Sequence, residues 1–389
     1  MNQPKGILAM IVLAQFCCTS LWFASNGVMG DLVLNFQLNQ SAIGHLTSAV
    51  QFGFIFGTLV YAILTIADRF SPSKVFFISA LLAALFNLGT TWENNTLISL
   101  VSMRFLTGFF LAGIYPVGMK IAADYFEKGL GKSLGFLVGA LVLGTAFPHL
   151  LKSVGSTFPW KAVIYATSIF SLIGGLMMMF FVPNGPFRKV GQGLNRLAFF
   201  DVFKNAQFRS LAFGYFGHMW ELYAFWAFVP VILKIYSSTQ VDVQINIPLW
   251  SFLIIGIGGL ACVLAGYLSQ RFGTKRTAFI SLLLSGTCCL ISPLLLTTNS
   301  AFFFLVFLLF WGMVVIADSP LFSTLVAQNA PSEIKGTALT IVNCLGFSIT
   351  IVSILLINSL IPLIDTQYLF LVLAVGPILG LLALKQKRD

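Results

Sequence analysis

Long apolar runs, separated by short polar segments, follow one another along the whole chain. A helix needs about 20 predominantly apolar residues to cross a bilayer. On that basis the pattern predicts an all-α membrane protein with twelve spans, near 7–29, 41–66, 75–91, 97–121, 133–151, 161–182, 208–231, 249–268, 277–296, 301–327, 337–361 and 368–384. The polar segment 183–207 divides them, which predicts two six-helix halves, 1–182 and 208–389, joined by a linker.

Composition agrees with lipid as the solvent. Apolar residues make up 58% of the chain and charged residues 9%, against roughly 25% charged in soluble domains. The six cysteines all lie in apolar runs and form no CxxC pair, so they are interpreted as buried thiols. The first span is interpreted as a retained helix, because no convincing small-residue cleavage site follows it.

The basic residues are distributed unequally between the two sides of the predicted topology. With both termini inside, eighteen lie on the cytoplasmic side, and only Lys152, Lys161 and Lys234 lie on the other. Cytoplasmic loops of membrane proteins carry such an excess. The bias predicts a multi-pass inner-membrane protein with both termini cytoplasmic. It also accounts for the net charge of +10 without a nucleic-acid partner.

Two loops indicate an internal repeat. The second span is followed by ADRFSPSK (67–74), and the eighth by SQRFGTKR (269–276). Arg69 in the first loop and Arg271 in the second are 202 residues apart.

Glycine and proline positions repeat at nearly the same offset. Gly108 and Pro116 in the fourth span correspond to Gly312 and Pro320 in the tenth, each 204 residues later. The chain is therefore interpreted as a duplicated six-span unit. Two such halves are the architecture of the major facilitator superfamily, which the chain resembles over its whole length.

The first loop carries the most specific part of this resemblance. It is similar to the superfamily signature G-x-L-A-D-R-x-G-R-K-x-x, with Asp68, Arg69 and Lys74 at the charged positions. Ser71 and Pro72 depart from it, because the signature has glycine and a basic residue there.

Two further segments extend the resemblance. The second loop keeps Arg271 but has Gln270 at the acidic position. We therefore expect this loop to contribute less to holding the two halves together on the cytoplasmic side. In the fourth span, Arg104 and Gly108 match the superfamily motif R-x-x-x-G.

The resemblance implies that the loop charges form a cytoplasmic gate. Asp68 would face the positive end of a helix that starts near Gly336. Arg69 would pair with Asp124 or Glu127 at the inner end of the fourth span. The alternative is that these residues are ordinary cytoplasmic charges.

Four ionisable residues lie deep in the predicted spans: Arg104, His218, Glu221 and Asp318. A charge at the bilayer centre costs roughly 2.5–3.5 kcal/mol on insertion scales, so a functional role is the default interpretation. The resemblance implies that spans 1, 4, 7 and 10 line a central cavity, and all four residues lie on those spans.

His218 and Glu221 are one helical turn apart, on one face and near mid-depth of the seventh span. A carboxyl group in a partly dry site can exchange a proton near neutral pH, and a neighbouring histidine can share that proton. Glu221 is therefore the leading candidate for proton coupling. There are two alternatives. Glu221 forms a constitutive ion pair with Arg104, or it is a structural carboxyl group hydrogen-bonded to Tyr or Trp.

Arg104 has two interpretations of equal weight. It anchors an anionic substrate through its bidentate guanidinium, or it is the permanent partner of Glu221. Asp318 precedes Ser319-Pro320, so a structural role at a broken helix competes with substrate contact.

The first span carries one stripe of side chains at spacings of four, three and four: Gln15, Thr19, Trp22 and Asn26. This stripe suits recognition of a polar substrate, with hydrogen bonding between helices as the alternative. Tyr223 and Trp226, close to Glu221, are candidates for stacking on a substrate.

These observations predict a secondary transporter that moves a small solute, an organic anion engaging Arg104, by alternating access with proton coupling. The alternative is a proton antiporter that exports drugs or siderophore-like metabolites. In the fifth span, Gly135 and Gly144 fit the superfamily's antiporter motif, but Pro148 and His149 stand where it has glycine and proline. This partial match favours uptake.

Other classes of protein are disfavoured. The chain has no P-loop and no catalytic set, so neither ATP hydrolysis nor enzymatic activity is expected. Its short tails leave no room for the output domain of a sensor. We expect a monomer without cofactor or metal, whose partners are the solute, protons and lipid.

Overall fold

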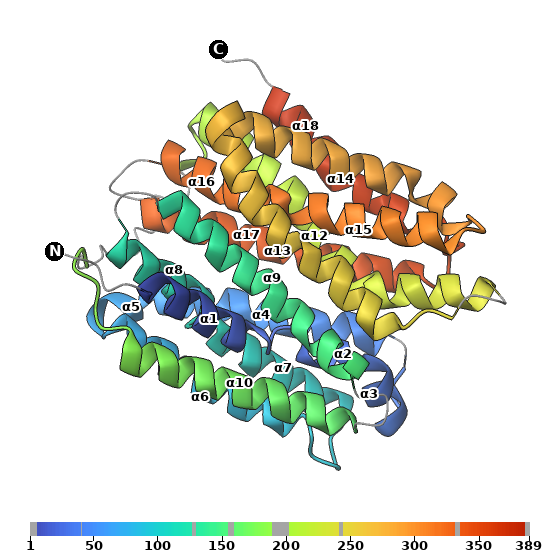
Figure 1. Cartoon of the computed structure of the whole chain (residues 1–389), viewed down its shortest axis with the longest axis horizontal. Coiled ribbons are helices and arrows are strands. Elements are labelled where there is room, and N and C mark those ends of the chain that lie inside the picture. Colours follow the sequence, from blue (N-terminus) through green and yellow to red (C-terminus); the bar gives the residue numbers. More distant parts are fainter. Residues whose placement is uncertain are drawn as a thin grey trace. The chain divides into compact units, whose positions relative to one another are not determined.

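The computed structural model describes residues 6–39, 41–126, 130–154, 159–188, 202–240, 244–330 and 335–385. The regular secondary structure in these ranges is helical (Figure 1). The chain divides into two compact units, unit 1 (Met1–Leu194) and unit 2 (Asn195–Asp389). The boundary falls within the expected linker 183–207, of which residues 189–201 lie outside the described ranges.

Unit 1 is a bundle in which the first helix packs on the last two. Its helices are α1 (Ile7–Thr19), α2 (Ala24–Gly27), α3 (Met29–Asn35), α4 (Ala42–Ile63), α5 (Ile66–Arg69), α6 (Pro72–Gly89), α7 (Leu97–Leu111), α8 (Tyr115–Tyr125), α9 (Leu130–Val154) and α10 (Trp160–Phe181). Helix α1 packs on α9 and α10, α4 packs on α7, and α6 packs on α7 and α10 (Figure 1).

Unit 2 repeats this plan. Its helices are α12 (Ala206–Thr239), α13 (Ile247–Phe272), α14 (Thr274–Leu296), α15 (Ala301–Ala317), α16 (Ser319–Asn329), α17 (Lys335–Leu360), the 3-10 helix η2 (Leu369–Ala374) and α18 (Val375–Lys385). Helix α12 packs on α17 and α18, α13 packs on α15, and α14 packs on α15 and α18. Each of these pairs has its counterpart in unit 1.

Ten helical segments in the described ranges are long and apolar enough to cross a membrane, with α7–α8 and α15–α16 each counted as one segment. The first and last expected spans are represented by shorter apolar helices, Ile7–Thr19 and Leu369–Lys385. The count of twelve spans therefore stays a prediction. Large apolar side chains are exposed on the outside of the helices, among them Ile98 and Leu294, as expected of a surface that faces lipid.

The repeated glycines lie where two helices touch. A Cβ atom on Gly108 would meet the backbone of Val50 in α4, and one on Gly312 would meet the backbone of Ile254 in α13. Val50 and Ile254 are themselves 204 residues apart. The repeat inferred from glycine spacing is thus also a repeat of helix contacts.

The repeated prolines each start a helix after a break. Helix α8 has Pro116 in its first turn and Ile114 as its N-cap residue. Helix α16 has Pro320 in its first turn and Asp318 as its N-cap residue. Proline is well suited to the first turn, where its missing N–H has no helical partner. The fourth and tenth spans are therefore broken at equivalent positions.

The two copies of the loop after the second and eighth spans turn by different means. In unit 2, Gly273 adopts φ 88°, in the left-handed region that favours glycine. In unit 1, Ser71 has φ −59° and Pro72 begins α6. The departure of Ser71-Pro72 from the superfamily signature thus accompanies a change in how the next helix starts.

Candidate functional site

A buried histidine–carboxylate pair joins two helical segments of unit 2. His218 Nδ1, on α12, lies 2.8 Å from Asp318 Oδ1, at the junction of α15 and α16. Both side chains are exposed by only 1%. The second ring nitrogen of His218, Nε2, has no hydrogen-bond partner in the described part of the chain. The pair thus leaves one polar atom of the imidazole available.

Asp318 is not needed to break the tenth span. Its side chain makes no capping hydrogen bond to α16. The equivalent break in unit 1 forms with Ile114, which has no polar side chain at all. The carboxylate of Asp318 is therefore not required for the break. It lies against His218 instead.

Glu221 is held by neutral donors. Trp311 Nε1 on α15 donates to Glu221 Oε1 at 2.6 Å, and Ser285 Oγ on α14 donates to Oε2 at 2.9 Å. Cys289 on α14 also lies near this carboxyl group. Of the three interpretations of Glu221, the hydrogen bond to a tryptophan matches these contacts directly.

His218 and Glu221 thus have separate partners although they are one turn apart on α12. The Nδ1 atom of His218 faces Asp318 rather than Glu221, and the tuning or sharing of the Glu221 proton by His218 stays a prediction. Asp318 and Glu221 are still near enough to influence each other electrostatically. The structure therefore brings three ionisable groups together in the interior of unit 2.

Arg104 closes a break in the first span. That span was expected to be continuous over 7–29, but α1 ends at Thr19 and α2 begins at Ala24. The guanidinium of Arg104 donates from Nη1 to the carbonyl oxygen of Leu21 at 3.1 Å and from Nη2 to that of Trp22. The interruption is thus stabilised by a side chain from α7.

The other contact of Arg104 is also neutral. Nη1 donates to Asn87 Oδ1 on α6 at 3.3 Å, and Nε has no partner in the described part of unit 1. These neutral contacts leave the guanidinium charge uncompensated in the described part of unit 1, and the interpretation of Arg104 as an anion anchor stays a prediction. Its pairing with Glu221 stays a prediction.

The stripe expected along the first span is divided by the same break. Asn26 Nδ2 on α2 donates to Thr47 Oγ1 on α4 at 2.8 Å, which is a contact between helices. The ring of Trp22 packs on Phe54 at 4.8 Å between centroids. The amide of Gln15 is fully buried, and neither of its polar atoms has a partner in the described residues.

The aromatic residues expected to stack on a substrate contact one another. Tyr223 and Trp226 are buried on α12, 5.3 Å apart between ring centroids. Tyr223 lies equally far from Phe347 on α17. These contacts place the two residues in the packing between α12 and α17, and stacking on a substrate stays a prediction.

In unit 1, the expected gate residues form other pairs than the predicted ones. Lys120 Nζ lies 2.8 Å from Asp68 Oδ1 and 3.9 Å from Asp124 Oδ1. The guanidinium of Arg69 donates to Thr65 Oγ1 at 3.0 Å, one turn back, so its predicted pair with Asp124 is not formed. Glu127, the other candidate partner, lies outside the described residues.

Two other expected gate residues lie at the surface. Lys74 is exposed in the first turn of α6. Arg271 is exposed at the end of α13, with its guanidinium 5.4 Å from the centre of the Phe272 ring. These positions test neither the gate nor the alternative of ordinary cytoplasmic charges.

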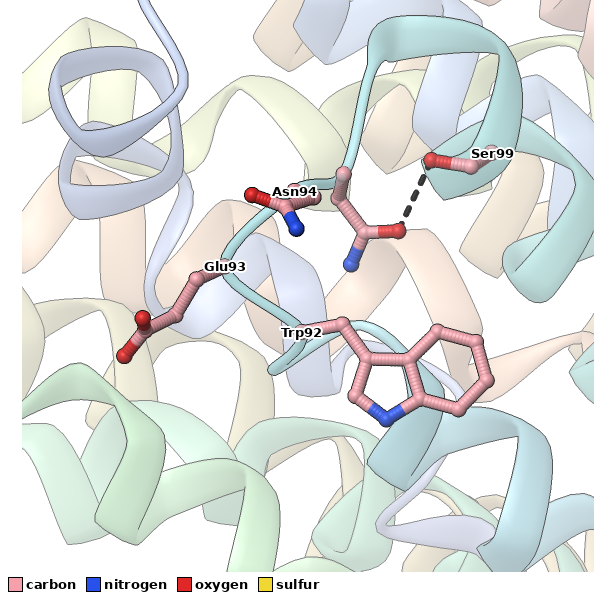
Figure 2. A pocket seen from close by; sticks show the side chains of 5 residues that line it. Trp92, Glu93, Asn94 and Ser99 are labelled. Carbon is pink, nitrogen blue, oxygen red and sulfur yellow. Dashed lines mark hydrogen bonds between the residues drawn. The ribbon is translucent and has the colours of Figure 1, made fainter.

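A surface cavity of about 470 Å³ lies in the loop between α6 and α7. Figure 2 shows Trp92, Glu93, Asn94 and Ser99 around it. Glu93 forms an exposed ion pair with Lys161 at 3.2 Å. None of the expected site residues lines this cavity.

Sequence reasoning missed the partners of Glu221. Trp311 directly precedes the repeated Gly312, and Ser285 and Cys289 lie in the polar cluster SGTCC of an otherwise apolar span. Those two features were the available signals. Within the described residues, no three histidine, cysteine or acidic side chains are grouped as metal ligands would be.

The sequence profile of the Major Facilitator Superfamily matches residues 11–354. The chain belongs to this superfamily. The resemblance to this superfamily is thereby confirmed. With its helices that are long and apolar enough to cross a membrane, the chain is a multi-pass membrane protein of this superfamily.

Individual superfamily members are only distantly similar. The chain is 27% identical over 198 residues to Efflux pump FUB11 of Gibberella moniliformis, covering 49% of this chain and 33% of the pump. It is 24% identical over 188 residues to 4-hydroxybenzoate transporter PcaK of Pseudomonas aeruginosa, covering 45% of this chain and 40% of that protein. Each alignment thus spans less than half of the relative's length.

The fold agrees with a solved superfamily structure. A mutant of the nucleoside transporter NupG aligns with a TM-score of 0.74 over 97% of this chain and 98% of its own, at 15% identity. At this identity the similarity concerns the fold alone.

Proposed function

We propose that this protein is a proton-coupled secondary transporter of a small organic anion. The observation that carries the proposal is the buried His218–Asp318 pair, with Glu221 one turn away in the same unit. Ionisable residues inside membrane spans are expensive, and they commonly mark proton relays and substrate paths. The coupling site proposed from the sequence, Glu221 with His218 beside it, is thereby enlarged to three groups.

The His218–Asp318 pair has the chemistry of a proton carrier. Nδ1 of His218 lies against the Asp318 carboxylate at 2.8 Å, so Nε2 is the atom that is free to gain or lose a proton. A protonated His218 is neutralised by Asp318, so the proton is held without an unpaired charge. Uptake and release at Nε2 on opposite sides of the membrane would couple the cycle to the proton gradient.

Buried polar side chains of unit 1 favour a polar, negatively charged solute as the substrate. The contacts of the Arg104 guanidinium in unit 1 are neutral, so among the residues described there no acidic side chain compensates its charge. The amides of Gln15 and Gln51 are fully buried and have no partners in the described residues. Buried polar groups are normally hydrogen-bonded, so unpaired ones favour a polar ligand. PcaK is named for the carboxylate 4-hydroxybenzoate.

Export by proton antiport is the second candidate. The similarity to Efflux pump FUB11 favours it. The partial antiporter motif in α9 remains against it, because Pro148 and His149 replace its glycine and proline. An exporter would extrude cationic or lipophilic dyes and would not depend on Arg104 for binding.

The topology and the gate belong to the same proposal. The excess of basic residues on one side supports an inner-membrane protein with cytoplasmic termini, twelve spans and a linker over 183–207. The Lys120–Asp68 ion pair supports a gating role for the first loop, with contacts that change during alternating access. We expect the monomer to be the transporting species.

Transport in proteoliposomes tests the proposal. Labelled 4-hydroxybenzoate serves as the anion and a cationic dye as the competing class, each with and without an imposed pH gradient. We expect His218→Gln and Asp318→Asn to abolish accumulation driven by the gradient. The matched control is Glu93→Gln, which removes an exposed carboxylate and should leave accumulation unchanged.

Two results would contradict this function. Gradient-driven accumulation that persists in both His218→Gln and Asp318→Asn would exclude the pair as the coupling site. Extrusion of the dye without transport of any anion would replace uptake by the export alternative.

A further inference from the structure

Glu221 has an arrangement of hydrogen bonds that fits both its protonated and its ionised form. We infer that Trp311 and Ser285 are positioning residues that let Glu221 gain and lose a proton in place. The inference rests on the proposed function in one respect, because it assigns a role to Glu221 within proton coupling. The arrangement itself depends only on contacts within unit 2.

Trp311 determines which oxygen carries the proton. An indole N–H is a donor only, so Glu221 Oε1 must accept from Trp311 in every protonation state. The indole is held by Phe225 and Phe307, whose ring centroids lie 4.5 and 5.5 Å from its own. The proton of a neutral Glu221 is therefore placed on Oε2.

Ser285 can serve both forms of Oε2. Its Oγ lies 2.9 Å from Glu221 Oε2 and 3.2 Å from the carbonyl oxygen of Leu282, one turn earlier on α14. With Glu221 ionised, the hydroxyl donates to Oε2. With Glu221 protonated, Oε2–H donates to Ser285 Oγ, and the hydroxyl turns to donate to Leu282.

Proton uptake therefore requires only the rotation of one hydroxyl group. The proton comes from water and forms one O–H bond at Oε2, and no other covalent bond changes. Every polar atom of Glu221 and Ser285 stays hydrogen-bonded in both forms. An unpaired buried polar group would be costly, so this arrangement keeps the two forms close in free energy.

Among the described residues, the titratable groups that act on Glu221 include no lysine or arginine. Asp318 interacts with Glu221 through its charge and is paired with His218. Cys288 and Cys289 on α14 lie near enough to interact with Glu221 electrostatically. The two neutral donors are thus the contacts that adjust its protonation most directly.

Infrared difference titration of the purified full-length protein tests this role. The carboxylic-acid C=O band of Glu221 is assigned by its loss in Glu221→Gln, and its intensity is followed against pH. We expect Ser285→Ala to move the titration midpoint up by about one pH unit. Hydrogen bonds to a charged group are roughly twice as strong as neutral ones, so the ionised form loses more.

The chain offers matched controls. Ser292 is buried on the same helix and bonds the carbonyl oxygen of Cys289 at 2.8 Å, so Ser292→Ala removes the same type of hydroxyl without touching Glu221. We expect it to titrate as wild type. Ser285→Thr, which keeps the hydroxyl, should restore the wild-type midpoint.

A second variant covers the case in which Ser285→Ala does not fold. Trp311→Phe removes the donor to Oε1 and should also raise the midpoint. Its control is Trp220→Phe, since Trp220 Nε1 donates to the carbonyl oxygen of Val372 at 3.0 Å instead.

The outcomes separate this inference from the proposed function. A midpoint unchanged by both Ser285→Ala and Trp311→Phe, or a wild-type protein without a titrating Glu221 band, would overturn the inference. If the midpoints shift as expected but no pH gradient drives transport, the inference stands and proton coupling fails.

Discussion

Replacing Gly312 by alanine tests whether the repeated glycines hold helix pairs together. The added Cβ atom would lie 2.9 Å from the carbonyl carbon of Ile254 and 3.2 Å from its Cγ2 atom, and closest to its carbonyl oxygen. Ordinary Cβ contacts begin near 3.4 Å. Because the obstacle is backbone, it cannot rotate away, so α13 and α15 must move apart.

Two effects of opposite sign set the magnitude. Overpacking costs about 1–3 kcal/mol, and the better helix propensity of alanine offsets about 1 kcal/mol of that. Since the contact is with rigid backbone, we take the upper end and expect a net loss of about 2 kcal/mol. At roughly 2–4 °C for each kcal/mol in a domain of this size, the Tm should fall by roughly 4–8 °C.

Thermal unfolding of the purified protein in detergent measures this effect. Gly266→Ala on α13 is the control, because no atom lies within 4 Å of the added Cβ. It should leave the Tm unchanged or slightly higher. Gly108→Ala should behave like Gly312→Ala, since it meets the backbone of Val50 in the same way. The reasoning is refuted if Gly312→Ala and Gly266→Ala unfold at the same temperature.

Two further substitutions probe unit 1. Arg104→Met should lower the Tm, because the carbonyl groups of Leu21 and Trp22 each lose a donor at about 1–3 kcal/mol, whereas Arg104→Lys should recover only part of this loss. An unchanged Tm in Arg104→Met would mean that water replaces the guanidinium. Asp68→Asn breaks the ion pair with Lys120, which is partly exposed to solvent, so the Tm should reflect a loss of no more than about 1 kcal/mol. A larger loss would show that this pair supports the fold.

Much of the fold could be predicted because the repeat leaves local marks. Gly108 and Gly312 are required by close backbone contact, and Pro116 and Pro320 by the start of a helix. Both requirements restrict which residue type can stand at the position, so the sequence shows them directly. The contact between the two helices then follows from the same glycines.

The break in the first span could not be predicted in this way. Its residues continue the apolar pattern, and the carbonyl groups that it frees at Leu21 and Trp22 are satisfied by Arg104. That residue lies about eighty positions further along the chain. A local pattern cannot show a break whose compensation is so distant.

The candidate site was predictable in its members and not in its pairings. His218, Glu221 and Asp318 stand out because charge is rare in an apolar span. Their spacing on the chain does not reveal which helices face them. The neutral partners Ser285 and Trp311 cost little to bury, so composition alone does not mark them.

The equivalent breaks at Ile114 and Asp318 separate backbone shape from side-chain chemistry. Both positions cap a helix with a proline in its first turn, yet one is aliphatic and the other acidic. The duplicated scaffold therefore tolerates very different side chains at this point. For an engineer, position 114 is a site where a polar group can be introduced into unit 1 on a backbone that already accommodates an acid in its duplicate.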